Sequence, residues 1–188
     1  MKISTFIGIY YNHRLQKANF IKKIYIYLII PINYFIEKLN YPKTINLDEY
    51  AKYKKKLFNK KINFLFQYFN SDKGDKFINQ YTRFSKKNNK LIKGHKYADY
   101  YEMFFKKIKK KKLKILELGS FKGNATASFF FYFKNSFIYS VDLYPDLFIY
   151  KSKKIKNFKV DNSSEKELLS LSKKKKYDLI IEDAGHYL

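Results

Sequence analysis

The chain has 188 residues, a formal net charge of +24 and no cysteine. A chain of this length buries a core, and 46% apolar residues exclude a disordered protein. The lack of cysteine excludes disulfides and thiolate metal sites.

The positive charge invites a nucleic-acid or anionic-membrane interpretation. However, the abundant lysine, asparagine, isoleucine, phenylalanine and tyrosine all have AT-rich codons, so genome composition alone explains such a bias. The lysine runs at 109–112 and 173–176 also fall between predicted elements, as solvated loops do. No RNA- or DNA-binding signature accompanies the charge, so we do not expect a nucleic-acid partner.

Residues 1–69 form a predicted helical extension that is basic and aromatic. Within it, residues 24–36 (IYIYLIIPINYFI) are apolar, flanked by lysines and interrupted by Pro31. The segment is shorter than the about 20 residues that span a bilayer, and no small-residue cleavage site follows. We favour a helix or helix pair packed on the domain. The alternative is an interfacial anchor, with aromatic rings in the headgroup layer and lysines on anionic lipid, at the inner face of the membrane of a cytoplasmic protein.

Residues 70–188 form a predicted α/β domain. A turn cluster (NSDKGD) occupies residues 70–75, and aromatic residues at three- to four-residue spacing predict a helix over 95–108. Further on, the pattern predicts strands at 113–119, 136–143, 157–162 and 177–184, and helices at 124–133 and 163–171. Strands separated by helices pair in parallel, so we expect a Rossmann-like, doubly wound, mostly parallel sheet.

The first chemical motif is ILELGSFKG at residues 115–123. Gly119 lets the backbone turn tightly beside a ligand, Gly123 lets a helix start close to the strand, and Ser120 lies in the loop between them. The motif is neither G-x-G-x-x-G nor a P-loop. Glu117, two residues before the first glycine, suits a positively charged cofactor such as S-adenosylmethionine, which carries a sulfonium and an ammonium.

Two further acids end predicted strands. Asp142 follows the glycine loop by some twenty residues, where a Rossmann-like sheet reaches ribose hydroxyls; the alternative is a strand-end turn before Pro145. Asp161 ends the third strand, where it would meet an adenine amino group or, equally well, serve as a turn or capping acid.

The closing motif is EDAGH, in which Asp183 and His186 lie three residues apart after a strand. A carboxylate and an imidazole on one loop bind a hard divalent cation and remove a proton from a hydroxyl held by it. The carboxyl end of a strand is where open α/β sheets place their ligands.

These motifs, in order and spacing, resemble the class I S-adenosylmethionine-dependent methyltransferases. The SDKG at 71–74, the HKYADYYEMFF at 95–105 and the closing acid-x-x-His resemble a subgroup that contains macrocin- and mycinamicin-type sugar O-methyltransferases and cephalosporin hydroxylase-like proteins. The resemblance covers about residues 70–188.

The resemblance implies Mg2+-dependent methyl transfer to a hydroxyl of a sugar or glycan-like metabolite. The residues it assigns to S-adenosylmethionine are Glu117, Gly119, Ser120, Gly123, Asp142 and Asp161. It makes Asp183 a metal ligand and His186 the general base. Asp72, Lys73 and Gly74 of SDKG would help to close the pocket.

Two features depart from the family. Ala184 and Gly185 stand where the family has Gly-Ser, and the fifth strand with its acidic pair does not follow. We therefore expect an incomplete sheet with strands one to four only, an apparent truncation, and little or no activity of residues 1–188. Alternatives are a related enzyme with another acceptor or hydroxylase-like chemistry, a non-catalytic basic module that docks on a membrane or nucleic acid, and a degenerate fragment. Oligomerisation is left open.

Overall fold

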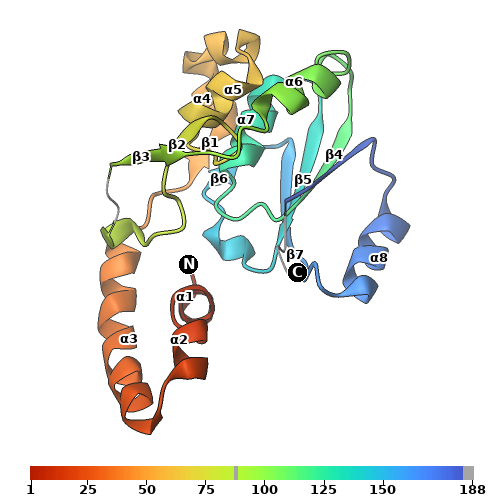
Figure 1. The fold of residues 1–188 in the computed structure, drawn as a ribbon. Helices are drawn as coiled ribbons and strands as arrows, with labels where there is room; N and C mark the ends of the chain where they lie inside the picture. Colours follow the sequence, from red (N-terminus) through yellow and green to blue (C-terminus); the bar gives the residue numbers. More distant parts are fainter. Residues whose placement is uncertain (87–88, 184–188) are drawn as a thin grey trace. The chain divides into compact units, whose positions relative to one another are not determined.

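The computed structural model describes residues 1–86 and 89–183, and these form two compact units. The first unit comprises residues 1–43 and 81–87, and the second comprises residues 44–80 and 88–188. Figure 1 shows the chain coloured along its sequence. The predicted boundary of the α/β domain at residue 70 stays a prediction.

The first unit is helical, with α1 (Ile3–Tyr10), α2 (Asn12–Lys17), α3 (Phe20–Asn40) and the 3-10 turn η2 (Phe84–Lys86). Its core consists of Phe6, Tyr11 and Ile30. Glu37 ties η2 to α3, because its buried carboxylate accepts hydrogen bonds from the backbone N–H of Phe84 (2.6 Å) and from the backbone and hydroxyl of Ser85 (3.0 and 2.7 Å).

The expected interruption at Pro31 is wrong, since α3 runs through it as one helix. Proline removes the hydrogen bond that its N–H would donate to the carbonyl of Tyr27. Pro31 and Tyr27 are both exposed, so water reaches that carbonyl. No helix in residues 1–86 and 89–183 is long and apolar enough to cross a membrane.

The second unit contains a four-stranded parallel sheet in the order β7-β5-β4-β8. Its strands are β4 (Lys114–Leu118), β5 (Phe137–Asp142), β7 (Ile155–Lys159) and β8 (Leu179–Glu182). All four predicted strands are therefore present, within two or three residues of their expected bounds. The mixed α/β architecture with a parallel sheet confirms the predicted Rossmann-like fold class.

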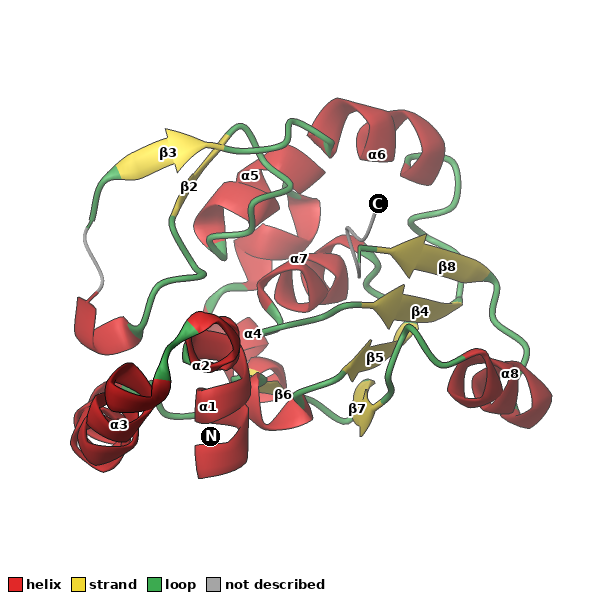
Figure 2. Ribbon diagram, turned by 60° about the horizontal axis from the view of Figure 1, so that its bottom comes forward, coloured by secondary structure: helices red, strands yellow, loops and turns green. Residues whose placement is uncertain are grey.

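Helices cover both faces of this sheet (Figure 2). On one face lies α7 (Asn124–Tyr132), all of whose residues are buried, packed against α5 (Ile62–Tyr68), beside which lies α6 (Ala98–Phe105). On the other lies α8 (Glu165–Lys174), whose Leu168 and Leu171 pack on the cluster of Leu116, Tyr139, Val141 and Val160. The alternation of side chains along β4 directs Ile115 and Glu117 to the α7 face.

The remaining elements of this unit are short. They are β1 (Ile45–Asn46), α4 (Leu47–Tyr53), η1 (Lys55–Asn59), β2 (Lys76–Ile78), β3 (Leu91–Lys93), η3 (Pro145–Leu147) and β6 (Tyr150–Lys151). β1 pairs in parallel with β6, and β2 pairs antiparallel with β3. The β2-β3 hairpin matters for the site because its flanks carry the SDKG and HKY motifs.

Candidate functional site

The glycine loop follows β4 and is built on three residues with positive φ: Gly119 (82°), Phe121 (47°) and Gly123 (84°). Gly123 is the N-cap of α7, and a Cβ there would lie 2.5 Å from the Phe148 ring. Both the backbone conformation and this close approach require glycine. The loop also folds back on itself, since the N–H of Gly123 donates to the carbonyl of Ser120 at 2.7 Å.

Asp142 ends β5 and braces this loop. One carboxylate oxygen accepts from the N–H of Phe121 at 2.7 Å, and the other accepts from the N–H of Tyr144 at 2.8 Å. Each carboxylate oxygen accepts more than one hydrogen bond, so capacity remains for ribose hydroxyls. The structure therefore shows a loop-bracing role that the sequence did not indicate, and the ribose role stays a prediction.

Asp161 makes turn contacts. Its carboxylate accepts from the backbone and the hydroxyl of Ser163, at 2.9 and 2.6 Å, and these bonds hold the pKa of Asp161 below its ordinary value. Ser164 caps α8 by accepting from the N–H of Glu167, whose own carboxylate accepts from the N–H of Asp161. The carboxylate of Glu167 thus bonds a backbone N–H three residues before the N-cap, whereas in a capping box it would bond the N–H of the N-cap residue itself. A contact of Asp161 with adenine stays a prediction.

Glu117 is a completely buried acid on the α7 face of β4. One of its oxygens accepts from the hydroxyl of Thr126, which also lies 3.3 Å from the hydroxyl of Ser140. The other oxygen, Oε1, has no hydrogen-bond partner among residues 1–86 and 89–183. Burial raises the pKa of Glu117 to about 7, although the positive charge of Lys73 acts in the opposite direction. A buried, half-satisfied carboxyl of this kind calls for a ligand or a structural explanation.

Lys73 supplies the positive charge at this place. Its side chain is buried, its ammonium binds the carboxylate of Asp183 directly, and it lies 3.8 Å from the carboxylate of Asp72. Burial by itself lowers the pKa of Lys73, but the negative charges of Asp183, Asp72 and Glu117 outweigh it, so the pKa is raised. Tyr101 lies in the same field, and burial raises its pKa to about 12. One ammonium thus faces three acidic groups.

Two segments of the hairpin region lock this lysine in place. Backbone hydrogen bonds run from His95 to the carbonyl of Asp72 (2.7 Å) and from Tyr97 to that of Lys73 (3.0 Å). Gly94 makes their approach feasible, because a Cβ there would lie 2.0 Å from the carbonyl oxygen of Gly74. The SDKG and HKY motifs, more than twenty residues apart in sequence, therefore form one structural element.

The structure thus brings some predicted site residues together and leaves others apart. Asp72, Lys73, Glu117 and Asp183 share one charge cluster, while Asp142 joins the glycine loop beside it. The buried hydroxyl of Ser120, like Oε1 of Glu117, has no hydrogen-bond partner in the described part of the chain. Ala184, Gly185 and His186 lie outside the described residues. Sequence reasoning missed Thr126, Tyr101 and Gly94. Thr126 is one of three polar residues in α7, with Asn124 and Ser128, so the sequence does not single it out.

The side chains of residues 1–86 and 89–183 do not fit the predicted Mg2+ site. Magnesium requires several oxygen ligands in near-octahedral arrangement. Asp183 instead binds the ammonium of Lys73, and residues 1–86 and 89–183 contain no group of three histidine or acidic side chains that could hold a metal ion. A second cation would be repelled by the buried ammonium. The Mg2+ prediction therefore continues to rest on the sequence resemblance.

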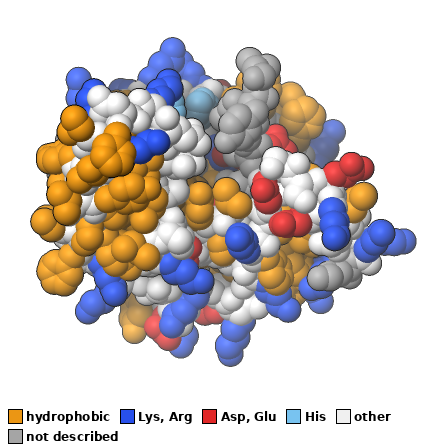
Figure 3. Space-filling view, turned by 90° about the horizontal axis from the view of Figure 1, so that it is seen from below, with side chains coloured by type: hydrophobic (Ala, Val, Ile, Leu, Met, Phe, Trp, Pro, Cys, Tyr) orange, Lys and Arg blue, Asp and Glu red, His pale blue; other side chains and the backbone are white. Residues whose placement is uncertain are grey.

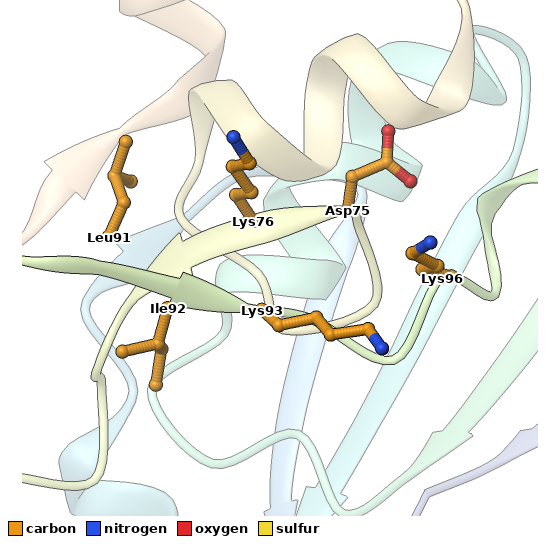
Figure 4. A pocket seen from close by; sticks show the side chains of 6 residues that line it. All are labelled: Asp75, Lys76, Leu91, Ile92, Lys93 and Lys96. Atoms are coloured by element: carbon orange, nitrogen blue, oxygen red, sulfur yellow. The ribbon is translucent and has the colours of Figure 1, made fainter.

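A pocket of about 590 Å3 lies along the β2-β3 hairpin (Figure 4). It is lined by Asp75, Lys76, Leu91, Ile92, Lys93 and Lys96. None of the predicted site residues lines it, and Asp75 uses one carboxylate oxygen to accept from the amide of Asn63 at 2.7 Å. This pocket is therefore separate from the charge cluster, although it begins one residue beyond SDKG.

Comparisons with known proteins identify no family model and no curated protein that match this chain. Among solved structures, the chain is similar to the MycE methyltransferase from the mycinamycin biosynthetic pathway, in complex with Mg, SAH and mycinamycin VI, with a TM-score of 0.43 and 19% identity. The similarity covers 48% of this chain and 25% of that one, so this chain spans a quarter of the solved chain's length.

Proposed function

We propose that the second unit is the cofactor-binding part of an S-adenosylmethionine-dependent methyltransferase. The observation that carries the proposal is the buried carboxyl of Glu117, whose Oε1 lacks a partner in the described chain, two residues before the loop that Gly119 and Gly123 delimit. S-adenosylmethionine supplies an activated methyl group when bound. Its positive charge gives Oε1 the partner that it lacks, and the buried hydroxyl of Ser120 supplies a further contact.

The side chains divide the work among themselves. Asp142 braces the glycine loop and offers its remaining acceptor capacity to the ribose. Lys73 is a positioning residue, since it neutralises Asp72 and Asp183 and keeps their carboxylates at the end of β8. We propose a hydroxyl of a sugar or glycan-like metabolite as the acceptor, on the sequence resemblance. His186 as the base that takes the hydroxyl proton is a prediction on the same ground.

Calorimetric titration of S-adenosylmethionine and S-adenosylhomocysteine tests the proposal. We expect both to bind, and Asp142→Asn to weaken both by about 10- to 100-fold, the range for a lost hydrogen bond to a charged group. Asparagine keeps an oxygen for one of the two backbone donors and turns its NH2 toward the other, so we also expect the free energy of unfolding to fall by about 1–3 kcal/mol. Urea unfolding measures this loss of loop bracing separately from ligand binding. Asp99→Ala, an exposed acid on α6, is the control.

Glu117→Gln locates the positive group that Glu117 meets. If Glu117 contacts the sulfonium, the variant lowers the affinity for S-adenosylmethionine and leaves that for S-adenosylhomocysteine unchanged, because the latter has no sulfonium. If Glu117 contacts the ammonium, the affinities for both ligands fall together. Failure of the wild-type chain to bind either ligand, or unchanged affinities in both variants, overturns the proposal. Low activity of residues 1–188 stays a prediction, which a labelled-methyl transfer assay checks.

A further inference from the structure

Helix α3 of the first unit presents apolar side chains on two opposite sides. One side packs inward, where Ile26, Ile29, Ile30 and Tyr34 join the core of Phe6 and Tyr11. The outward side carries a second apolar row at helical spacing, which we call the outer stripe. The outer stripe consists of Ile21, Ile24, Tyr25, Leu28, Ile32, Phe35, Ile36 and Leu39.

The outer stripe is strongly exposed. Its members Ile21, Leu28 and Leu39 are 77%, 69% and 71% exposed, and lie at 100° per residue within about 20° of one another around the helix axis. Single exposed apolar residues are normal, but a continuous row along a helix of about 30 Å marks an interaction surface. Figure 3 shows hydrophobic side chains gathered in a broad patch, with lysine and arginine side chains around it.

The charges of this unit select the kind of partner. In residues 1–43 and 81–87, Glu37 is the only acidic residue, and it is fully buried with its carboxylate bonded to Phe84 and Ser85. Every other charged side chain in these segments is basic. Lys22 and Lys38 lie about 100° to either side of the stripe's centre, so they flank it. The surface is apolar with basic margins and has no acidic side chain.

We propose that α3 lies along an anionic lipid surface, with the outer stripe inserted at the headgroup boundary and the flanking lysines on lipid phosphates. An interfacial helix has this arrangement of a long apolar face and basic margins. A nucleic acid would match the lysines but would leave eight aliphatic and aromatic side chains in water. The inward side remains packed on α1, so the unit keeps its own core while bound.

Sedimentation of the 188-residue chain with vesicles tests this. We expect binding to vesicles of phosphatidylcholine and phosphatidylglycerol in equal parts and little binding to phosphatidylcholine alone. The triple variant Ile21→Gln, Leu28→Gln, Leu39→Gln should lower the partition coefficient by about a hundredfold, at roughly fivefold per withdrawn side chain. These residues are exposed and glutamine favours helix, so circular dichroism should be unchanged.

A matched control removes three exposed apolar side chains from the second unit: Tyr53→Gln, Tyr100→Gln and Phe104→Gln, at 86%, 65% and 64% exposure. This control should bind as the wild type does. Equal loss in both triple variants would show general adhesiveness and overturn the proposal. So would vesicle binding that is indifferent to the outer-stripe variant, which would indicate charge attraction alone.

The lysines are tested separately. Lys22→Gln, Lys38→Gln should lower binding to the anionic vesicles by about 25-fold, since each lysine near such a surface contributes about a factor of five. A charge-matched control at the exposed Lys52 and Lys55 should have a much smaller effect. Equal effects overturn the placement on α3. A wild-type dimer that the outer-stripe variant dissociates, without vesicle binding, would assign the stripe to self-association instead.

Discussion

Each of the two units buries a glutamate completely, and the two are bonded in opposite ways. Glu37 uses both carboxylate oxygens, which accept three hydrogen bonds from Phe84 and Ser85. Glu117 uses one oxygen, toward Thr126, while Oε1 has no partner in the described part of the chain. The two side chains are therefore equally buried, but they differ in how many of their carboxylate oxygens have a hydrogen-bond partner. A buried acid whose oxygens all have hydrogen-bond partners indicates a structural contact. One with an oxygen that lacks a partner indicates a ligand-binding site.

The groups that surround the two glutamates also differ. Glu117 lies near a buried lysine and within the field of Asp183 and Asp142. Glu37 is enclosed by a helix and a 3-10 turn of its own unit, with backbone N–H groups as donors. Residue type alone therefore does not distinguish a ligand-binding site from a structural contact. The hydrogen-bond partners of each carboxylate oxygen distinguish them.

The largest effect should follow from removing the cation of the second unit. Lys73→Met removes the buried ammonium that the buried Asp72 and the half-buried Asp183 face, so we expect the free energy of unfolding to fall by about 3–5 kcal/mol. Urea unfolding measures this change. The same substitution at the exposed Lys22 of the first unit should change it by less than about 0.5 kcal/mol. Equal effects at the two lysines would mean that the charge cluster does not stabilise the fold.

Replacing each glutamate by glutamine compares the two acids directly. In Glu37→Gln an amide NH2 faces donors that formerly met an oxygen, so we expect a loss of about 1–3 kcal/mol and faster amide exchange at Phe84 and Ser85. Glu117→Gln at pH 8 keeps an acceptor for Thr126 and removes a poorly compensated charge, so stability should hold or rise. Similar losses in the free energy of unfolding at both positions would contradict the distinction between a structural contact at Glu37 and a ligand-binding site at Glu117.

The sheet of the second unit was predictable because its signals are local. The short apolar runs at 113–119, 136–143 and 177–184 and the glycine loop each carry their pattern within ten residues, and all became elements of the expected kind. The N-cap of α8 is a local feature too, since Ser164 accepts from the N–H of Glu167 three residues later. Pro31 misled, since its penalty depends on whether water reaches the freed carbonyl, and exposure is set by tertiary packing.

The charge cluster was predictable only in part. Lys73 and Asp183 stand 110 residues apart, and no local pattern says that their side chains meet. The bracing of the glycine loop by Asp142 and the approach of Gly94 to Gly74 are likewise products of chain topology. The sequence could name the acids at strand ends, because parallel strands bring their carboxyl ends to one edge. The sequence did not predict that Lys73 would bind Asp183 where a metal ion was expected.

The sharpest test of the comparison is pH. Burial raises the pKa of Glu117 from 4.5 to about 7, so between these values the folded chain retains a proton that the unfolded chain has released. The folded state then binds more protons, and this contribution to stability is lost as pH rises through the window. We expect wild-type stability to fall from pH 5 to pH 8 relative to Glu117→Gln. Lys73, with a raised pKa, contributes its change only above 10.5, outside the window.

Thr126→Val sharpens this measurement. The hydroxyl of Thr126 lowers the pKa of Glu117 by bonding its charged form, so its removal should move the loss of stability to higher pH. Urea unfolding of wild type, Glu117→Gln and Thr126→Val at a series of pH values gives the three curves. Parallel curves for wild type and Glu117→Gln would mean that the carboxyl titrates alike in folded and unfolded chains. Glu117 would then be solvated in the folded protein, and its contrast with Glu37 would disappear.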